Sequence, residues 1–100
     1  MYNIAMIISF KDKETEKVFN GLFSNKLPQD IQKIALRKLI MINNANNLKD
    51  LLVPPGNRLE ELQGKLSGKY SIRINEQWRI IFIPDKEGRN YLDVEIVDYH

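Results

Sequence analysis

The chain has 100 residues, of which 43% are apolar and 28% charged, and its formal net charge is +2. This length fits one compact domain covering residues 1–100, and the balance of apolar and charged residues excludes a disordered tail. The absence of cysteine excludes disulfides, thiolate nucleophiles and zinc sites built on sulfur.

The first predicted elements are a strand and a short helix. Residues 4–10 are apolar apart from Ser9 and predict a buried strand. Asp12 can cap a helix that follows, because its carboxylate accepts hydrogen bonds from the first free N–H groups. We expect four apolar side chains to share one side of this helix: Val18, Phe19, Leu22 and Phe23.

A second, longer helix is predicted from Pro28, which fits the first helical position, to about Asn43. Apolar residues at helical spacing should face the core, namely Ile31, Ile34, Ala35, Leu39 and Ile42. The asparagine-rich run 43–47 should end the helix, because asparagine side chains compete for backbone hydrogen bonds. Residues 48–57 contain Pro-Pro-Gly and predict an irregular connection.

The remainder of the chain alternates with a period of two and predicts strands. These are residues 59–63, 70–75 and 78–83, followed after a polar turn by a last strand containing Leu92, Val94 and Ile96. Residues 64–68 are rich in turn formers and predict a loop. A strand, two helices and a meander of strands indicate an α+β domain with helices on one face of a sheet.

The hairpin at Trp78 permits a prediction of register. Its apolar residues share one face only if Ile74 opposes Trp78 and Ile72 opposes Ile80, which requires the three-residue loop 75–77. In this register Arg73 lies directly opposite Arg79.

Two like charges at opposed positions destabilise a strand pair unless an anion lies between them. One candidate is a carboxylate of the last strand, from Asp93, Glu95 or Asp98. The other is an RNA phosphate, because the planar guanidinium group matches its geometry. The pattern leaves both interpretations open.

The chain ends in Asp98-Tyr99-His100, immediately after the last strand. These residues are either a frayed end or functional groups. Histidine is suited to proton transfer near neutral pH, and tyrosine can stack on an unpaired base. His100 is the only histidine, so a metal site is not expected, nor is any cofactor.

The charge distribution is compatible with nucleic-acid binding. Residues 1–82 hold 13 Lys and Arg against 8 Asp and Glu, whereas residues 83–100 hold 2 against 5. A basic body of this kind can bind a phosphate backbone, although a solvated surface of mixed charge has the same counts.

We expect a cytoplasmic protein without a membrane partner. No apolar run approaches the roughly 18 residues of a membrane span, and the first residues lack the basic and apolar segments of a signal peptide. Met6 is a second candidate start, which would make residues 1–5 an N-terminal extension.

Several segments together resemble the HigB family of toxins, also called plasmid-maintenance killer proteins, within the RelE/ParE superfamily. They are residues 6–10 (MIISF), 54–60 (PPGNRLE), 70–75 (YSIRIN), 77–80 (QWRI) and 94–100 (VEIVDYH). The ordered combination of the Trp-Arg-Ile strand and the Asp-Tyr-His end is specific, and the resemblance covers essentially the whole chain from Met6.

This resemblance implies a RelE-like fold, in which two N-terminal helices pack on a twisted, mostly antiparallel sheet. It also implies a toxin of a type II toxin–antitoxin system that enters the 70S ribosome and cleaves mRNA without a metal. In related ribonucleases the 2′-hydroxyl attacks the adjacent phosphate and leaves a cyclic phosphate.

The resemblance also implies site residues. Arg79 matches the family's phosphate-facing arginine, and Asp98, Tyr99 and His100 match its functional end. We assign His100 to proton transfer, Tyr99 to base stacking or a hydrogen bond, and Asp98 to orienting its neighbours. Candidate RNA-binding residues, which include Arg73 from the hairpin argument, are Arg58, Lys65, Lys69 and Arg73.

One departure from the family concerns the strand before the glycine loop. Glu60 and Gln63 stand where well-studied HigB ribonucleases have a histidine and a lysine. Glu60 or Glu61 becomes a candidate base, with Glu60 preferred, and Lys65 and Lys69 are candidates to replace the lost positive charge.

The expected partner is a HigA-type helix-turn-helix antitoxin, and operator DNA is expected to be bound only through the toxin–antitoxin complex. The alternatives are a ParE-like inhibitor of DNA gyrase on the same fold, and a catalytically weakened chain that serves as an antitoxin-binding co-repressor.

Overall fold

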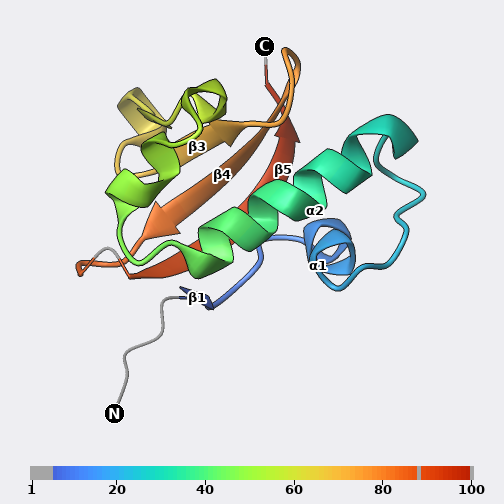
Figure 1. The fold of residues 1–100 in the computed structure, drawn as a ribbon, viewed down its shortest axis with the longest axis horizontal. Coiled ribbons are helices and arrows are strands. Elements are labelled where there is room, and N and C mark those ends of the chain that lie inside the picture. Colours follow the sequence, from blue (N-terminus) through green and yellow to red (C-terminus); the bar gives the residue numbers. More distant parts are fainter. Residues whose placement is uncertain (1–5, 88, 100) are drawn as a thin grey trace.

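The computed structural model describes residues 6–87 and 89–99, and it contains two helices beside a five-stranded sheet (Figure 1). The helices are α1 (Lys13–Phe19) and α2 (Gln29–Asn44). The strands are β1 (Met6–Ile7), β2 (Glu60–Glu61), β3 (Tyr70–Arg73), β4 (Trp78–Pro84) and β5 (Asn90–Asp98). This architecture confirms the predicted α+β class.

The strand order is β1-β5-β4-β3-β2, with β1 parallel to β5 and all other pairs antiparallel. The sheet is therefore mostly antiparallel, as predicted. The described part of the first strand is shorter than residues 4–10, because regular pairing is limited to Met6 and Ile7. Contact with β5 continues through a hydrogen bond from the Ile8 N–H to the Tyr91 carbonyl (2.8 Å) and a bridge between Phe10 and Val94. Residues 4 and 5 lie outside the described residues.

Helix α2 supplies the helical half of the core. It begins one residue after Pro28, which takes the N-cap position, and it ends at Asn44 within the predicted asparagine run. Four of the five predicted core positions on α2 are buried and the fifth is partly buried; the buried ones are Ile31, Ala35, Leu39 and Ile42. They pack against one face of the sheet, on which Ile72, Ile80 and Ile96 are also buried.

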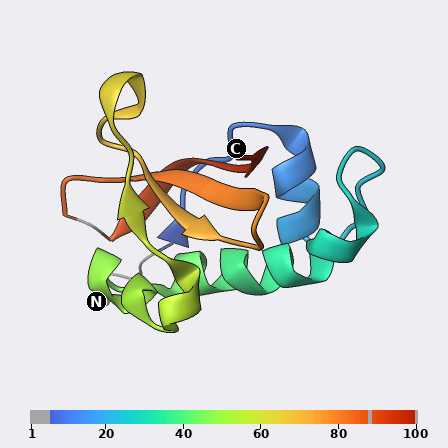
Figure 2. The ribbon, with the colours of Figure 1, turned by 90° about the horizontal axis from the view of Figure 1, so that it is seen from above.

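Helix α1 packs beside one end of α2 and next to β5 (Figures 1 and 2). Asp12 caps it as predicted, accepting a hydrogen bond of 2.7 Å from Thr15 N–H. The Thr15 hydroxyl in turn accepts the Ile96 backbone N–H at 2.9 Å. Strand β1 pairs only with the first half of β5. The hydroxyl of Thr15 on α1 therefore accepts a backbone N–H of the second half, which would otherwise lack a hydrogen-bond partner at this edge of the sheet.

The prediction that Leu22 and Phe23 continue the apolar side of the first helix is wrong. Helix α1 ends at Phe19, and both side chains are 59% exposed. The chain turns away at Gly21, whose φ of +80° lies in the region that favours glycine.

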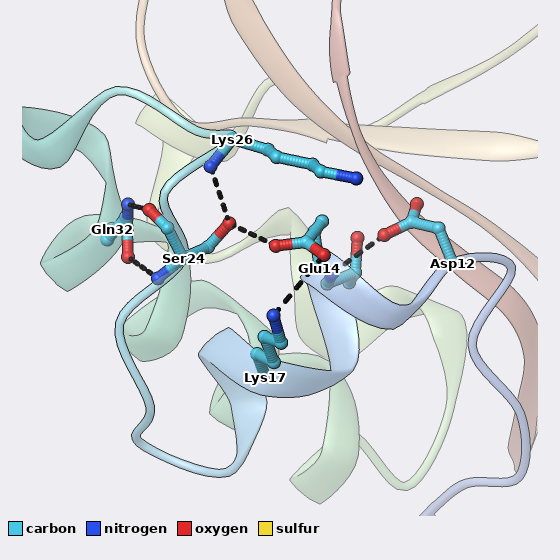
Figure 3. A network of polar contacts seen from close by, with 7 residues as sticks. Asp12, Glu14, Lys17, Ser24, Lys26 and Gln32 are labelled. Carbon is cyan, nitrogen blue, oxygen red and sulfur yellow. Dashed lines mark hydrogen bonds and ion pairs between the residues drawn. The ribbon is translucent and has the colours of Figure 1, made fainter.

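A polar network around the buried Ser24 holds the connection between the two helices (Figure 3). The Ser24 hydroxyl donates to Glu14 and accepts from the Lys26 backbone N–H. Gln32 reaches back from α2, accepting from Ser24 N–H at 3.0 Å and donating to the Ser24 carbonyl at 2.7 Å. Lys17 completes the network with an ion pair to Glu14. The hydrogen bond from Ser24, together with this lysine, lowers the pKa of Glu14.

The connection 48–57 is ordered and irregular, as predicted, and consists of two 3₁₀ turns, η1 (Leu48–Leu52) and η2 (Pro55–Asn57). The predicted strand 59–63 is reduced to the two residues of β2. The positive φ of Arg58 (46°) on one side and of Gly64 (66°) on the other bends the backbone out of the extended conformation.

The last strand differs from its predicted alternation. Tyr91, Val94 and Ile96 are buried, whereas Leu92 is only partly buried. The pairing advances by two positions on β4, from Ile81 to Ile83, but by three positions on β5, from Glu95 to Leu92. This β-bulge includes Asp93, whose φ is +50°, and it reverses the inward and outward positions on one side of the bulge.

Tyr91 connects β5 to the end of α2 and provides a stability prediction. Its hydroxyl donates to the Ala45 carbonyl at 2.9 Å, and burial raises the pKa of Tyr91 to about 12. The phenol should therefore stay neutral in the folded chain between pH 10 and 12, where it ionises in the unfolded chain. The free energy of unfolding should be reduced by about 2–3 kcal/mol across that window.

Urea unfolding of the wild type and of Tyr91→Phe at pH 8, 10 and 12 tests this prediction. At pH 8 the wild type should be more stable by about 1 kcal/mol, the typical value of one hydrogen bond. By pH 12 the order should reverse, because phenylalanine cannot ionise. A constant difference between the two proteins at all three pH values would contradict the assignment.

No helix in the described part of the chain is long and apolar enough to cross a membrane.

Candidate functional site

The two hairpin arginines lie on the sheet face that points away from α2. Arg73 pairs with Arg79 and Ile72 with Ile80, which confirms the predicted register. Because Ile72 and Ile80 are buried beneath α2, the alternation of side chains along each strand places the arginines on the opposite face.

The loop between β3 and β4 is held by Asn75. Its side-chain oxygen accepts hydrogen bonds from the backbone N–H groups of Gln77 (2.8 Å) and Trp78 (2.7 Å). The Ile74 N–H donates to the Trp78 carbonyl at 2.9 Å, so residues 75–77 form the predicted three-residue loop. An asparagine turn of this kind fixes the length of the loop and with it the pairing of Arg73 with Arg79.

Arg79 is fixed by hydrogen bonds on two sides of its guanidinium group. Nε donates to the Ser71 hydroxyl at 2.8 Å, and Nη2 donates to the Arg58 carbonyl at 2.7 Å. The carboxylate of Glu60 lies 3.9 Å from Nη2. No described residue accepts a hydrogen bond from Nη1, whose two N–H groups are suited to an anionic acceptor.

Arg79 is largely buried, although it lies on the sheet face opposite α2. The residue is only 9% exposed, because the chain from Arg58 to Glu60 covers it from one side. Burial lowers the pKa of Arg79, and the positive charges of Arg73 and Arg58 act in the same direction, while Glu60 opposes them. The group nevertheless stays charged, since an arginine side chain is not deprotonated in proteins.

The carboxylates that form ion pairs with the two arginines, among the described residues, are Glu60 and Glu76, which lie outside the last strand. Glu76 lies 3.9 Å from Arg73, and its side chain is 95% exposed, so this ion pair contributes little to stability. Two last-strand acids form other interactions: Glu95 pairs with Lys11 at 3.4 Å and Asp93 contacts Ser9. Within residues 6–87 and 89–99, the carboxylates therefore neutralise the two arginines only loosely.

Tyr99 completes a pocket on this face. Its backbone N–H donates to the Gln77 carbonyl at 2.7 Å, and its ring centre lies 5.6 Å from the Arg79 guanidinium carbon, within cation–π range. The pocket has a volume of about 270 Å³ and is lined by Arg58, Arg73, Asn75, Glu76, Arg79 and Tyr99. We call it the arginine pocket.

The structure thus brings together four predicted site residues, Arg58, Arg73, Arg79 and Tyr99, and places Glu60 beside them. Asp98 does not line the pocket: it pairs with Trp78 in the register, and it accepts a hydrogen bond from Gln77 at 3.0 Å. His100 lies outside the described residues.

The two candidate lysines are placed elsewhere. Lys65 and Lys69 belong to the excursion between β2 and β3, which projects from the sheet in Figure 2, and neither lines the arginine pocket. Gln63, the second residue at which the sequence departs from the family, is exposed and immediately precedes the 3₁₀ turn η3 (Gly64–Leu66).

Three polar contributors were not singled out as site residues in the sequence: Ser71, Asn75 and the Arg58 carbonyl. A signal for Ser71 was present, because it alternates with Arg73 on the same face of β3. Asn75 was recognised only as a loop residue. The Arg58 carbonyl had no sequence signal, since any residue type provides one.

The arrangement can bind an anion. Three guanidinium groups line one shallow pocket, one of them rigidly held, and an aromatic ring lies beside them. Guanidinium groups suit phosphate, and the ring can stack on a base. In the described part of the chain, no group of three or more His, Cys, Asp or Glu side chains is arranged to hold a metal ion.

Comparison with known proteins is consistent with this geometry. Residues 8–100 match the family model of the RelE-like toxin of the type II toxin–antitoxin system HigB. The chain is 42% identical over 78 residues to Toxin HigB-1 of Vibrio cholerae, covering 77% of this chain and 82% of that protein.

Solved structures with a similar fold include the YoeB–YefM complex from Staphylococcus aureus, with a TM-score of 0.54, 22% identity and coverage of 98% and 99% of the two chains. YafQ from E. coli has a TM-score of 0.51, 14% identity and coverage of 90% of each chain. At these identities the likeness concerns the fold alone. On the family match and the similarity to Toxin HigB-1, the chain belongs to the HigB-like family of RelE-like toxins of type II toxin–antitoxin systems.

Proposed function

We propose that this toxin is a ribosome-dependent endoribonuclease that cleaves mRNA and thereby inhibits translation. The observation that carries the proposal is the arginine pocket, in which the fixed guanidinium group of Arg79 lies beside the ring of Tyr99. A buried cation with unused N–H donors is suited to the extra negative charge that develops on a phosphate during cleavage.

The proposed reaction needs no cofactor. The 2′-oxygen forms a bond to the adjacent phosphorus as the bond to the 5′-oxygen breaks, which leaves a cyclic phosphate and a free 5′-hydroxyl. A base takes the proton of the 2′-hydroxyl, and an acid donates one to the 5′-oxygen. We assign one of these transfers to His100 and regard Glu60, 3.9 Å from Arg79, as the candidate for the other.

The other predicted residues have supporting roles. Arg58 and Arg73 would bind the phosphates that flank the cleaved bond, and Tyr99 would stack on a base. Lys65 and Lys69, on the projecting excursion, would contact RNA outside the pocket. Asp98, which precedes Tyr99 and contacts Gln77, would orient the end of the chain.

We further propose that a HigA-type helix-turn-helix antitoxin neutralises the toxin in the cytoplasm, and that operator DNA is bound through the complex. The family match to a toxin of a type II system supports a protein antitoxin as partner.

The decisive experiment supplies the purified toxin with programmed 70S ribosomes and maps the 5′ ends of the transcript. We expect cleavage only when ribosomes are present, and suppression of cleavage by the antitoxin. Inhibition of gyrase supercoiling without transcript cleavage would instead favour the ParE-like alternative. Antitoxin binding with neither activity would favour the co-repressor.

A further inference from the structure

Helix α2 contains a buried lysine whose hydrogen-bond partner is neutral. Lys38 is only 8% exposed, and its ammonium group donates to the side-chain oxygen of Asn57. Burial, together with the neighbouring Arg37, lowers the pKa of Lys38. An ammonium group buried against an amide rather than a carboxylate is unfavourable for folding. This contact therefore calls for an explanation other than stability.

Asn57 is fully buried at the end of η2 and forms hydrogen bonds with the backbone of residues 51–54. Its Nδ2 donates to the carbonyls of Leu51 at 3.2 Å and Val53 at 3.5 Å. Its backbone N–H donates to the Pro54 carbonyl at 2.9 Å. Lys38 thus fixes a side chain that in turn fixes the whole turn 51–57 against α2. Figure 1 shows this turn between the C-terminal half of α2 and β3.

The residue after Asn57 reaches the arginine pocket. Arg58 adopts a φ of +46°, a left-handed conformation that arginine rarely takes and that its surroundings must maintain. In this conformation its N–H donates to the Pro55 carbonyl at 3.0 Å, and its own carbonyl accepts from Arg79 Nη2 at 2.7 Å. Its side chain lines the pocket.

We propose that Lys38 and Asn57 are positioning residues for the arginine pocket. They hold the turn that sets Arg58 in its left-handed conformation, and the Arg58 carbonyl then fixes the direction of the Arg79 guanidinium group. The inference rests on the proposed nuclease function for its effect on cleavage, although the effect on Arg79 itself does not require that function.

The test uses Lys38→Met, which keeps an unbranched apolar side chain and removes the ammonium group. The orientation of Arg79 is read directly from its ¹⁵N Nε–H resonance, and cleavage is measured as kcat and KM on programmed ribosomes. We expect the resonance to shift or broaden and kcat to fall by about 10²-fold, the loss typical of a misplaced catalytic group. KM should change less than kcat, because Arg73, Lys65 and Lys69, which also bind RNA in the proposed function, lie outside the turn 51–57.

Two further variants separate positioning from stability. Lys38→Gln retains a neutral N–H donor for Asn57 and should recover part of the lost kcat. Val18→Ala destabilises the core at α1, away from the turn, and should leave both the resonance and kcat as in the wild type.

Wild-type kcat and resonance in Lys38→Met would overturn the proposal, as would equal losses in Val18→Ala. If the wild type does not cleave RNA at all, the nuclease proposal fails. The Arg79 resonance in Lys38→Met then decides the positioning role alone: a shift supports it and an unchanged signal overturns it.

Discussion

Arg79→Ala should reduce ribosome-dependent cleavage by about 10²–10³-fold and abolish growth arrest on expression. The physical reason is that a fixed donor to a developing negative charge acts mainly on the transition state, so its loss reduces kcat. The measurement is single-turnover cleavage on programmed ribosomes, together with growth after induction.

The burial of Arg79 determines the controls. Truncation leaves the Ser71 hydroxyl and the Arg58 carbonyl without their donor, which should lower the free energy of unfolding by about 1–3 kcal/mol. Arg79→Lys keeps the charge but loses the planar fork, and it should still cleave at least tenfold more slowly. Arg37→Ala, which removes an exposed arginine of α2, should cleave normally. Full cleavage by both Arg79 variants would remove this residue from the mechanism.

His100→Gln should slow cleavage by about 10²–10⁴-fold, the range typical of a positioned general acid or base. Histidine has an ordinary pKa of about 6.5, so wild-type cleavage should vary with pH near neutrality. Glutamine does not titrate, and the variant's residual rate should lack that dependence. The measurement is the single-turnover rate from pH 5.5 to 8.5.

The substitution His100→Gln is preferable to deletion because it leaves the length of the chain unchanged. Lys86→Gln, an exposed change in the β4–β5 turn, serves as the control. If His100→Gln retains the wild-type rate and pH profile, His100 has no part in proton transfer, and Glu60 becomes the residue to test next.

Much of the fold was predictable because local rules and burial agree. Three features depend only on residues that are close in sequence, and the tertiary structure preserves them. They are the Asp12 cap, the apolar side of α2 and the Trp78 hairpin. The failures occur where tertiary contacts override the local pattern. Residues 22 and 23 leave the helix because the Ser24 network holds the loop, and the bulge at Asp93 changes which side of β5 is buried.

The candidate site divides in the same way. The opposed arginines followed from the hairpin alternation, because a one-residue slip would have exposed its apolar face. The burial of Arg79 did not follow from that alternation, because it depends on how the turn before β2 folds back over β3. That fold depends on Lys38, 19 residues away in sequence from its partner Asn57.

By itself the sequence determined the class of fold, the family and the opposed pair of arginines, because these depend on spacing between near neighbours and on recognisable segments. Only the tertiary structure decided that Arg79 is buried, that a backbone carbonyl and Ser71 orient it, and that Tyr99 rather than Asp98 faces it. The physical reason is that burial and hydrogen-bond geometry depend on which distant segments meet, and residue spacing along the chain does not specify that.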